Sequence, residues 1–265
     1  MYIKDFVKKL LPIQNLDNLY VVADFDRTIT AGSSLTSWSV LADTNLVPEE
    51  YSIERHRLYE IYRPIEVNTS LPFKYRMKMM DEWFRAHIQL FVTYKMTEEA
   101  FEKAATDLRV MEFRTGAQEF LKFLYENHIP LIIISAGIGN FIEAFLKNYD
   151  CYFDNIYVSS NKVLFENGIA VGVGENVIHS FNKNEVSLPP KVKDKLKRRN
   201  QVLLLGDQTS DLNMVNKSLH DSVITIGFEP DDPNDPCNSL EDFQAGFDIV
   251  CEPHENYIDL KKILF

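Results

Sequence analysis

Short, unbroken apolar runs recur along the chain, and each of the clearest ones ends beside a small or acidic residue. These runs cover residues 19–23, 131–134, 202–205 and 223–226, with weaker examples at 156–158 and 247–250. Apolar runs of this length without polar alternation are typical of strands buried on both faces, as in a parallel sheet. Helical patterns lie between them, at residues 116–127, 140–148, 190–199 and 211–218. The alternation predicts an α/β fold with a parallel sheet and right-handed crossovers.

The stretch from residue 34 to residue 110 has a different pattern, because no strand-like run interrupts it. Its apolar spacing predicts helices over residues 36–43, 49–62, 73–91 and 97–108, with turns near Pro48, Pro64 and Pro72. We therefore expect an α/β core made of residues 1–33 and 111–265, with residues 34–110 inserted as a helical cap. Ligands of an open α/β sheet bind beyond the carboxyl ends of its strands, so an insertion directly after the first strand would stand over that site.

Composition and charge limit the classes of partner. With 265 residues, of which 45% are apolar and 25% charged, the chain has an ordinary composition for a globular protein. Its net charge of −11 makes it a poor non-specific binder of nucleic acid or of an anionic membrane, and we expect neither partner. An anionic small-molecule substrate is compatible with this charge, because a bound metal ion can reverse the local sign. The sequence pattern does not predict the oligomeric state.

Cysteine usage and the N-terminal residues bear on location. The cysteines, Cys151, Cys237 and Cys251, are too few and too scattered for a disulfide framework or a zinc site, which fits a reducing compartment. Charged residues at positions 5, 8 and 9 interrupt any signal-peptide core. No apolar run approaches the roughly 20 residues needed to cross a bilayer. We therefore expect a cytoplasmic protein.

Two aspartates follow the first predicted strand, in the sequence Asp24-Phe25-Asp26-Arg27-Thr28. Two carboxylates so close repel each other unless a proton or a cation relieves them, and a hard divalent cation is the obvious partner. An ionised carboxylate can attack phosphorus and form an aspartyl-phosphate, while a second carboxyl protonates the leaving oxygen and later activates water. The alternative is a pair of aspartates that only caps a turn.

A second acidic pair follows the run at 202–205, in the sequence Gly206-Asp207-x-x-x-Asp211. Asp207 could reach a metal ion held by Asp24. Asp211 would lie in the first turn of the next helix, where the helix dipole favours an anion. Taken alone, Asp211 could be no more than a helix-start residue.

Ser135-Ala136-Gly137 ends a third predicted strand, and Lys183 precedes the strand at 202–205. A hydroxyl and free backbone N–H groups at a strand end can hold a phosphate oxygen. Taken alone, Ser135 could be an ordinary N-cap and Lys183 a solvated surface lysine.

The four motifs, in this order, resemble those of the haloacid-dehalogenase superfamily of aspartate-nucleophile phosphatases. The surrounding residues make the chain similar to the cytosolic pyrimidine 5′-nucleotidases. The segments that carry this likeness are Ile134-Ser135-Ala136-Gly137-Ile138-Gly139, His179-Ser180-Phe181-Asn182-Lys183, Leu204-Leu205-Gly206-Asp207, Asp211-Leu212-x-Met214, Tyr62-x-Pro64-Ile65-Glu66-Val67 and Met80-Asp81-Glu82-Trp83 with His87. The likeness runs from about Leu19 to Val250 and includes the inserted helices.

The resemblance implies a Rossmann-like core with a helical cap and Mg²⁺-dependent hydrolysis of a phosphomonoester, a pyrimidine nucleoside 5′-monophosphate. The catalytic residues would be Asp24 as nucleophile, Asp26 as general acid and base, Ser135 and Lys183. The metal ligands would be Asp24, the main-chain carbonyl of Asp26, and Asp207, with Asp211 in support. The phosphate would be bound by Ser135, Ala136, Gly137 and Lys183.

The resemblance also implies roles in the cap. Glu82 would accept a hydrogen bond from the nucleobase, and Trp83 and His87 would line the slot for it. Trp83 and His87 lie four residues apart, hence on one face of a predicted helix, although either could simply pack in the cap. The loop at residues 29–38 and the pair Asn184-Glu185, in place of the usual His-Asp, depart from the family pattern and bear on the nucleotide preference.

Three alternatives stay open. The chain could be a capped phosphatase for another small phosphate such as phosphoserine, or a non-catalytic phospholigand-binding protein of the same fold. It could also be a metal-dependent glycosyltransferase that uses Asp24 and Asp26 as a nucleotide-sugar metal site. That alternative leaves Ser135, Lys183 and Asp207 unexplained.

Overall fold

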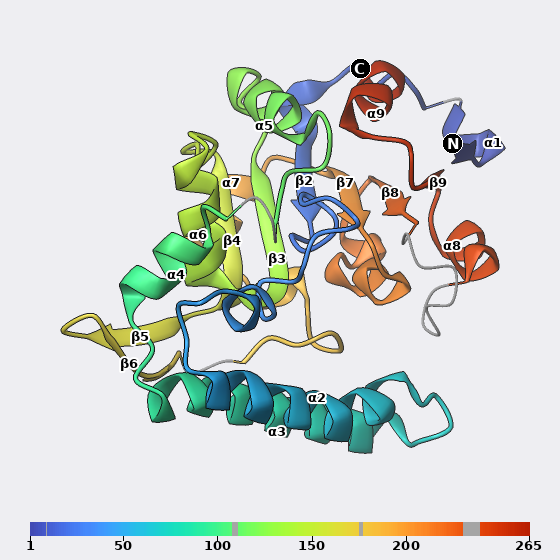
Figure 1. Ribbon diagram of the computed structural model, residues 1–265. Helices are drawn as coiled ribbons and strands as arrows, with labels where there is room; N and C mark the ends of the chain where they lie inside the picture. The colour runs from blue at the N-terminus through green and yellow to red at the C-terminus, as the bar shows by residue number, and fades with distance from the viewer. Residues whose placement is uncertain (9, 108–110, 175–176, 230–238) are drawn as a thin grey trace.

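The computed structural model describes residues 1–8, 10–107, 111–174, 177–229 and 239–265. Within these ranges, seven strands form one sheet in the order β1-β9-β8-β7-β2-β3-β4 (Figure 1). The strands are β1 (Tyr2–Ile3), β2 (Leu19–Ala23), β3 (Leu131–Ile138), β4 (Ile156–Asn161), β7 (Gln201–Gly206), β8 (Ser222–Phe228) and β9 (Ile249–Cys251). All neighbours pair in parallel except β1 with β9, so the predicted α/β fold with a parallel sheet is confirmed.

Side chains of β2 alternate between two hydrophobic cores, one on each face of the sheet. Leu19, Val21 and Ala23 point into the larger core, which also contains residues of α5 (Ala117–Glu126), α6 (Gly139–Asn148) and α9 (Tyr257–Leu264). Tyr20 and Val22 point into the smaller core, under α7 (Pro190–Leu196) and the 3₁₀ segment η4 (Thr209–Met214). Because β2 is buried on both faces, it needs the unbroken apolar run that the sequence has. Further elements lie at the chain ends: α1 (Asp5–Lys8), η1 (Leu16–Asn18) and α8 (Leu240–Gly246).

The order of the strands fixes the place of the site. The chain leaves β2 for β3 and β4 on one side, and later returns to β7 and β8 on the other. A crevice opens where the strand order reverses in this way, at the carboxyl ends of the strands. Asp24 follows β2, residues 135–137 end β3, and Asp207 follows β7, so all three motifs meet at this edge.

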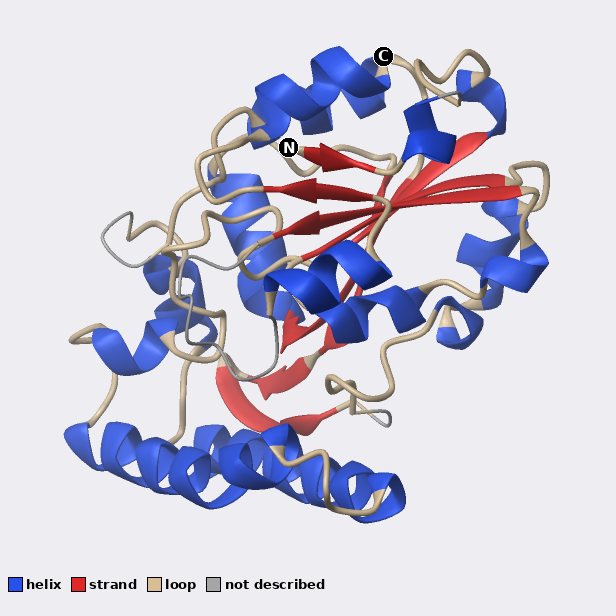
Figure 2. Ribbon diagram, turned by 90° about the vertical axis from the view of Figure 1, so that its right-hand side faces the viewer, coloured by secondary structure: helices blue, strands red, loops and turns tan. Residues whose placement is uncertain are grey.

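Most of the inserted segment forms two long helices, α2 (Glu49–Val67) and α3 (Phe73–Thr93). They lie side by side beyond the carboxyl ends of the strands, as both ribbon views show (Figures 1 and 2). The shorter α4 (Glu98–Ala104) packs against α6 of the core instead. A two-stranded hairpin, β5 (Val163–Glu166) and β6 (Ile169–Val173), contacts α3 from the core side. Its turn residues, Asn167 and Gly168, both have positive φ, as a type I′ turn requires.

Three predicted helices differ from the observed ones. The helix expected at residues 36–43 is only a 3₁₀ turn, η2 (Val40–Asp43), because residues 36–39 turn inward to contact the core. The helix expected at 211–218 is split into η4 and η5 (Lys217–Leu219), since the Asn216 side chain caps the second segment. Helix α2 continues past Tyr62 through Pro64, which removes one N–H from an intermediate-to-exposed part of the helix. The expected end at residue 108 and the cap boundary at 110 lie outside the described residues, as does Cys237.

Candidate active site

A cavity of about 370 Å³ lies between the carboxyl ends of the central strands and the helices α2 and α3. Its core side contains residues of each of the four sequence motifs, although not Asp211, and its other side is formed by the inserted segment. The core wall includes Asp24, Asp26, Arg27, Ser135, Ala136, Gly137, Ser180, Lys183, Asp207 and Gln208. The other wall includes Thr36, Trp38, Ser39, Arg55, His56, Tyr59, Arg63, Glu66, Trp83, Phe84 and His87.

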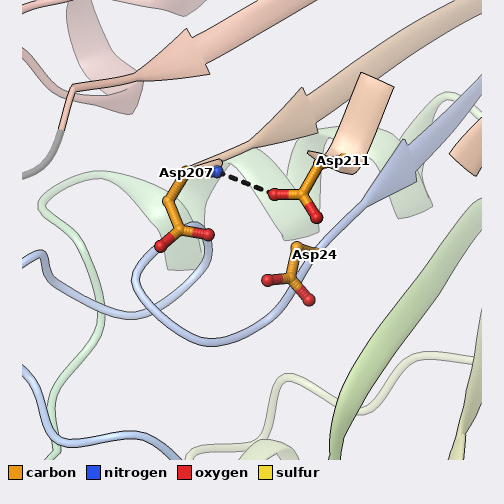
Figure 3. A group of neighbouring side chains, drawn as sticks. All are labelled: Asp24, Asp207 and Asp211. Atoms are coloured by element: carbon orange, nitrogen blue, oxygen red, sulfur yellow. Dashed lines mark hydrogen bonds between the residues drawn. The ribbon is translucent and has the colours of Figure 1, made fainter. Parts of the chain in front are cut away.

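Three buried aspartates, Asp24, Asp207 and Asp211, converge at the edge of the sheet (Figure 3). One carboxylate oxygen from each lies within 4.8 Å of the other two. Burial raises the pKa of Asp207 and of Asp211 above the usual range, since a low-dielectric site disfavours the charged form. The neighbouring negative charges add to this rise. The cluster therefore needs a cation or a proton.

Lys183 supplies one cation. Its Nζ lies 3.0 Å from Asp24 Oδ1 and 3.0 Å from Asp211 Oδ1, and the side chain is buried. Burial alone would lower the pKa of Lys183, but the charges of Asp211, Asp24 and Asp207 outweigh burial and raise it. Lys183 is thus protonated at the centre of the cluster, which excludes the alternative of a solvated surface lysine.

The oxygens of Asp211 and Asp207 are used differently. Both oxygens of Asp211 are occupied: Oδ1 accepts from Lys183, and Oδ2 accepts from the backbone N–H groups of Asp207 and Gln208. Asp207 Oδ1 is buried and accepts no hydrogen bond from any described residue. An orphaned carboxylate oxygen next to Asp24 suits a hard divalent cation, which prefers oxygen ligands. The donor set therefore fits Mg²⁺, with Asp211 orienting the loop that carries Asp207.

Gly206 makes this loop possible. A Cβ at Gly206 would lie 2.5 Å from Asp211 Cβ and 2.6 Å from Asp211 Oδ2. Only glycine lets the end of β7 approach Asp211 so closely. The spacing of the Gly206-Asp207-x-x-x-Asp211 motif therefore has a packing cause as well as a chemical one.

Asp26 faces the cavity two residues after Asp24. Its carboxylate accepts two hydrogen bonds from Ser37, from the backbone N–H at 2.8 Å and from Oγ at 2.9 Å. Burial, and then the charge of Asp24, raise the pKa of Asp26 to about 7, against the effect of the Ser37 hydrogen bonds. A carboxyl with a pKa near neutrality suits a group that both gives and takes a proton.

Residues 135–137 form an irregular end to β3, where the pairing with β4 shifts register between Ile134 and Ile138. Ser135 Oγ accepts a hydrogen bond from Gly137 N at 3.0 Å, and Ala136 O accepts one from Trp38 Nε1 at 2.8 Å. Ser135 is not a helix N-cap, since α6 begins after Ile138. The structure thus brings Asp24, Asp26, Asp207 and this loop together, as the strand pattern predicted, and it adds Lys183, as the family resemblance implied.

Of the three residues predicted to bind the base, Trp83 and His87 line the cavity and Glu82 is not among its described lining residues. Trp83 lines the cavity and stacks on Tyr62, with ring centroids 6.0 Å apart and an angle of 9° between the planes. His87 also lines the cavity but is buried, and its Nε2 lies 3.2 Å from Tyr51 Oη. Burial lowers the pKa of His87 to about 3, so the ring is neutral. Glu82 is not in the described wall: its carboxylate is half-exposed and lies 3.5 Å from Lys78 Nζ.

Among the described residues, the inserted segment contributes the carboxylate of Glu66 to the cavity wall, a residue for which the sequence predicted no role. Glu66 Oε1 accepts from Ser180 Oγ at 2.6 Å, and Oε2 accepts from Arg63 at 2.6 Å. Glu66 lies in the segment Tyr62-x-Pro64-Ile65-Glu66-Val67 that carried part of the family resemblance. That segment could have pointed to Glu66. The predicted helix ended at Tyr62, however, so Glu66 was not expected to lie on a helix that lines the cavity.

Glu185, in the pair Asn184-Glu185 that departs from the family pattern, is buried. Glu185 accepts hydrogen bonds from Tyr20 Oη at 2.8 Å and from Asn216 N at 2.9 Å, and His220 Nε2 lies 2.9 Å from it. These contacts tie the loop that carries Lys183 to β2 and to the region after β7. Glu185 therefore helps to hold this loop, and neither Asn184 nor Glu185 is among the described residues that line the cavity.

No helix in the part of the chain that the structure describes is both long and apolar enough to cross a membrane. Cys151 and Cys251 are buried and unpaired with each other.

Comparison with known proteins extends these observations. Residues 25–264 match the family model described as pyrimidine 5′-nucleotidase (UMPH-1). A Xenopus laevis protein named 7-methylguanosine phosphate-specific 5′-nucleotidase A is 30% identical over 243 residues, which cover 88% of this chain and 82% of that protein. A crystal structure of cytosolic 5′-nucleotidase IIIB bound to cytidine superposes with a TM-score of 0.85 and 25% identity, covering 98% of this chain and 91% of the other. A substrate-bound phosphoserine phosphatase complex shares the fold, with a TM-score of 0.57 and 17% identity over 92% of this chain and 97% of the other.

Proposed function

The chain belongs to the pyrimidine 5′-nucleotidase family and is a phosphatase of the haloacid-dehalogenase fold, and from this premise we propose that it hydrolyses nucleoside 5′-monophosphates with Asp24 as nucleophile and Mg²⁺ as cofactor. The observation that carries the proposal is the convergence of Asp24, Lys183 and Asp207 at the cavity of about 370 Å³. The helices α2 and α3, within residues 34–110, act as the cap that selects the substrate.

The chain offers ligands for one Mg²⁺ ion. Asp24, the unpaired Asp207 Oδ1 and the main-chain carbonyl of Asp26 would hold it. When bound, the ion neutralises charge on the transferring phosphoryl group and on the surrounding carboxylates. Asp211 keeps the loop with Asp207 in place through its two backbone hydrogen bonds.

The proposed reaction proceeds in two steps on the chain's own residues. Asp24 attacks phosphorus and the bond to the nucleoside O5′ breaks, while Asp26 gives its proton to that oxygen. Water then attacks the phosphorus of the aspartyl-phosphate and gives its proton to Asp26. Inorganic phosphate leaves, and Asp24 is restored. Lys183, the Ser135 hydroxyl and the backbone N–H of Ala136 hold the phosphoryl oxygens, since phosphoryl transfer depends mainly on positioning and charge stabilisation. The Gly137 N–H, predicted as a further phosphate donor, instead donates to the Ser135 hydroxyl and fixes its position.

The cap side of the cavity has features of a nucleobase slot. Trp83 and Tyr59 present aromatic surface to it, and the Glu66 carboxylate has lone pairs left after its two observed hydrogen bonds. We propose Glu66, in place of Glu82, as the acceptor for the base. His87 is neutral and packed, so we propose that it shapes the wall and does not carry charge.

Pyrimidine nucleoside monophosphates are the first candidate substrates, in keeping with the family description and the cytidine-bound neighbour. The second candidate is 7-methylguanosine 5′-monophosphate, after the name of the Xenopus laevis relative. Its methylated base carries a positive charge, which a carboxylate such as Glu66 and aromatic faces would attract. A cytoplasmic location is part of the proposal, supported by the name of the cytidine-bound neighbour and by the two buried, unpaired cysteines.

The test is phosphate release from CMP, UMP, 7-methyl-GMP, other nucleoside monophosphates and phosphoserine, with Mg²⁺ and with a chelator. Asp24→Asn is the key variant, and Asp221→Asn, at an exposed position, is its matched control. Mg²⁺-dependent release from nucleotides that Asp24→Asn abolishes supports the proposal. Faster release from phosphoserine would support the alternative phosphatase. No release from any substrate by the folded protein would support the non-catalytic binding protein.

A further inference from the structure

We propose that Ser37 is a positioning residue for Asp26, holding its carboxyl where it can protonate the leaving oxygen. The inference rests on the proposed function, in which Asp26 is the general acid and base. Ser37 is fully buried and is not part of the cavity wall, so it would act through Asp26 and not by touching the substrate.

Both oxygens of the Asp26 carboxyl are engaged by this one residue. The backbone N–H of Ser37 donates to Oδ1 at 2.8 Å, and the Ser37 hydroxyl lies 2.9 Å from Oδ2. A hydroxyl can donate to a carboxylate and can also accept from a carboxylic acid. The Ser37 contact therefore survives when Asp26 gives up its proton to the leaving oxygen and when it recovers one from water.

The Ser37 hydroxyl is itself fixed by the phosphate-binding loop. Ser37 Oγ accepts a hydrogen bond from Ile138 N at 3.2 Å. A Cβ at Gly137 would lie 2.2 Å from Ser37 Oγ and 3.1 Å from Asp26 Oδ2. Because Gly137 has no side chain, Ser37 and Asp26 can meet in the space that a Cβ would occupy. Ser135 Oγ lies beside the same space, 3.0 Å from the position of that Cβ.

The residues that follow Ser37 contact both the core and the helices α2 and α3. Trp38 donates from Nε1 to Ala136 O at 2.8 Å and packs on His87 of α3, with ring centroids 4.5 Å apart. Arg55 of α2 donates from Nε to Trp38 O at 3.2 Å and from its guanidinium to Ser39 Oγ. These contacts fix the path of residues 36–39, and the same path sets where Ser37 meets Asp26. The loop after the first motif, which departs from the family pattern, thus carries the residue that positions the general acid Asp26.

The first experiment compares two leaving groups. A nucleoside leaves as a strongly basic alkoxide and needs a proton, whereas p-nitrophenyl phosphate loses a weakly basic phenolate that does not. For Ser37→Ala we expect kcat with CMP, or with the best nucleotide substrate, to fall roughly 10- to 100-fold, with KM changed less than about twofold. With p-nitrophenyl phosphate we expect kcat within about twofold of the wild type. Ser37→Thr, which keeps the hydroxyl, should restore most of the nucleotide activity.

Ser34→Ala is the matched control, because Ser34 is also buried in this loop but its hydroxyl, among the described residues, bonds only to the backbone of Glu112. It should change neither activity. Equal losses on both substrates in Ser37→Ala, or no loss on either, would overturn the proposal. Thermal melting of every variant separates loss of fold from loss of function.

A double-mutant cycle gives a second, independent measurement. If Ser37 acts through Asp26, adding Ser37→Ala to Asp26→Asn should lower nucleotide turnover by less than about twofold beyond Asp26→Asn alone. Effects that multiply would mean that Ser37 acts elsewhere. A wild-type protein that hydrolyses no phosphate ester would refute the proposed function, and this inference with it. An active wild type with multiplying effects refutes this inference alone.

Discussion

Glu66 Oε1 accepts a hydrogen bond from Ser180 Oγ at 2.6 Å, so an acid of the cap helix α2 is tied to the core at the wall of the cavity. Glu66 and Glu82 can therefore be separated by mutation. We expect Glu66→Gln to lower kcat/KM for nucleotides roughly ten- to hundredfold, since a hydrogen bond to a charged group contributes about 1.5–3 kcal/mol.

Glu82→Gln is the matched control, because Glu82 is half-exposed and contacts Lys78. It should leave kcat/KM within about twofold, as exposed ion pairs contribute little. The measurement is steady-state kinetics with CMP, UMP and 7-methyl-GMP. A loss confined to Glu82→Gln would show that Glu82 reaches the base and that Glu66 only joins cap to core.

Lys183 is expected to matter for stability as well as for turnover. Lys183→Met would leave Asp24 and Asp211 facing each other without the cation that now lies 3.0 Å from each. Breaking a buried pair in this way costs about 3–5 kcal/mol, and we expect that decrease in the free energy of unfolding with a chelator at pH 8. Added Mg²⁺ should recover part of the stability, while nucleotide hydrolysis should fall by more than about a hundredfold.

Urea unfolding with and without Mg²⁺ checks this prediction. Lys191→Met, at an exposed position, is the control and should unfold as the wild type does. If Lys183→Met proved as stable as the wild type without metal, the three carboxylates would be relieved by protons and not by Lys183.

Gly206 offers a test of the packing behind the acidic loop. Gly206→Ala would bring a Cβ to 2.5 Å from Asp211 Cβ, which the backbone can relieve only by moving the loop that carries Asp207. We expect it to lower the free energy of unfolding by about 1–3 kcal/mol. Gly172→Ala is the control, because a Cβ there would meet nothing within 4 Å, and it should change stability by less than about 0.5 kcal/mol. Equal unfolding curves for the two variants would contradict the clash.

The core of the site could be predicted from the sequence because its geometry follows from the sheet. Apolar runs marked β2, β3 and β7, and parallel strands end at one edge, so Asp24, Ser135 and Asp207 had to meet there. Lys183 comes from a loop, and only the family resemblance placed it. Its two carboxylate partners became visible only in the structure.

The cap could not be predicted to the same depth. Which face of α3 meets the cavity depends on how α2 and α3 pack, and helical spacing groups Trp83 with His87 without excluding the neighbouring Glu82. Pro64 suggested a helix end, yet α2 continues to Val67 and carries Glu66 inward. Ser37 has no motif at all, because its contact with Asp26 depends on the path of a loop held by tertiary contacts.

His87 gives a prediction about acid stability. Burial, and then the charge of Arg55, lower the pKa of His87 from 6.5 to about 3. At a pH between these two pKa values, His87 is protonated in the unfolded chain and neutral in the folded protein. Lower pH therefore favours the unfolded chain, so the stability due to neutral His87 is complete above about pH 6.5 and is lost as the pH falls towards 3. Between pH 7.5 and pH 5.5 the loss should be about 1.4 kcal/mol.

Urea unfolding at the two pH values, for the wild type and for His87→Gln, isolates this contribution because all other groups titrate in both proteins. The decrease in the wild type should exceed that in His87→Gln by the same amount, about 1.4 kcal/mol. Equal decreases would mean that His87 takes up its proton in the folded protein, and that its contact with Tyr51 and its packing against Trp38 leave room for a charged ring.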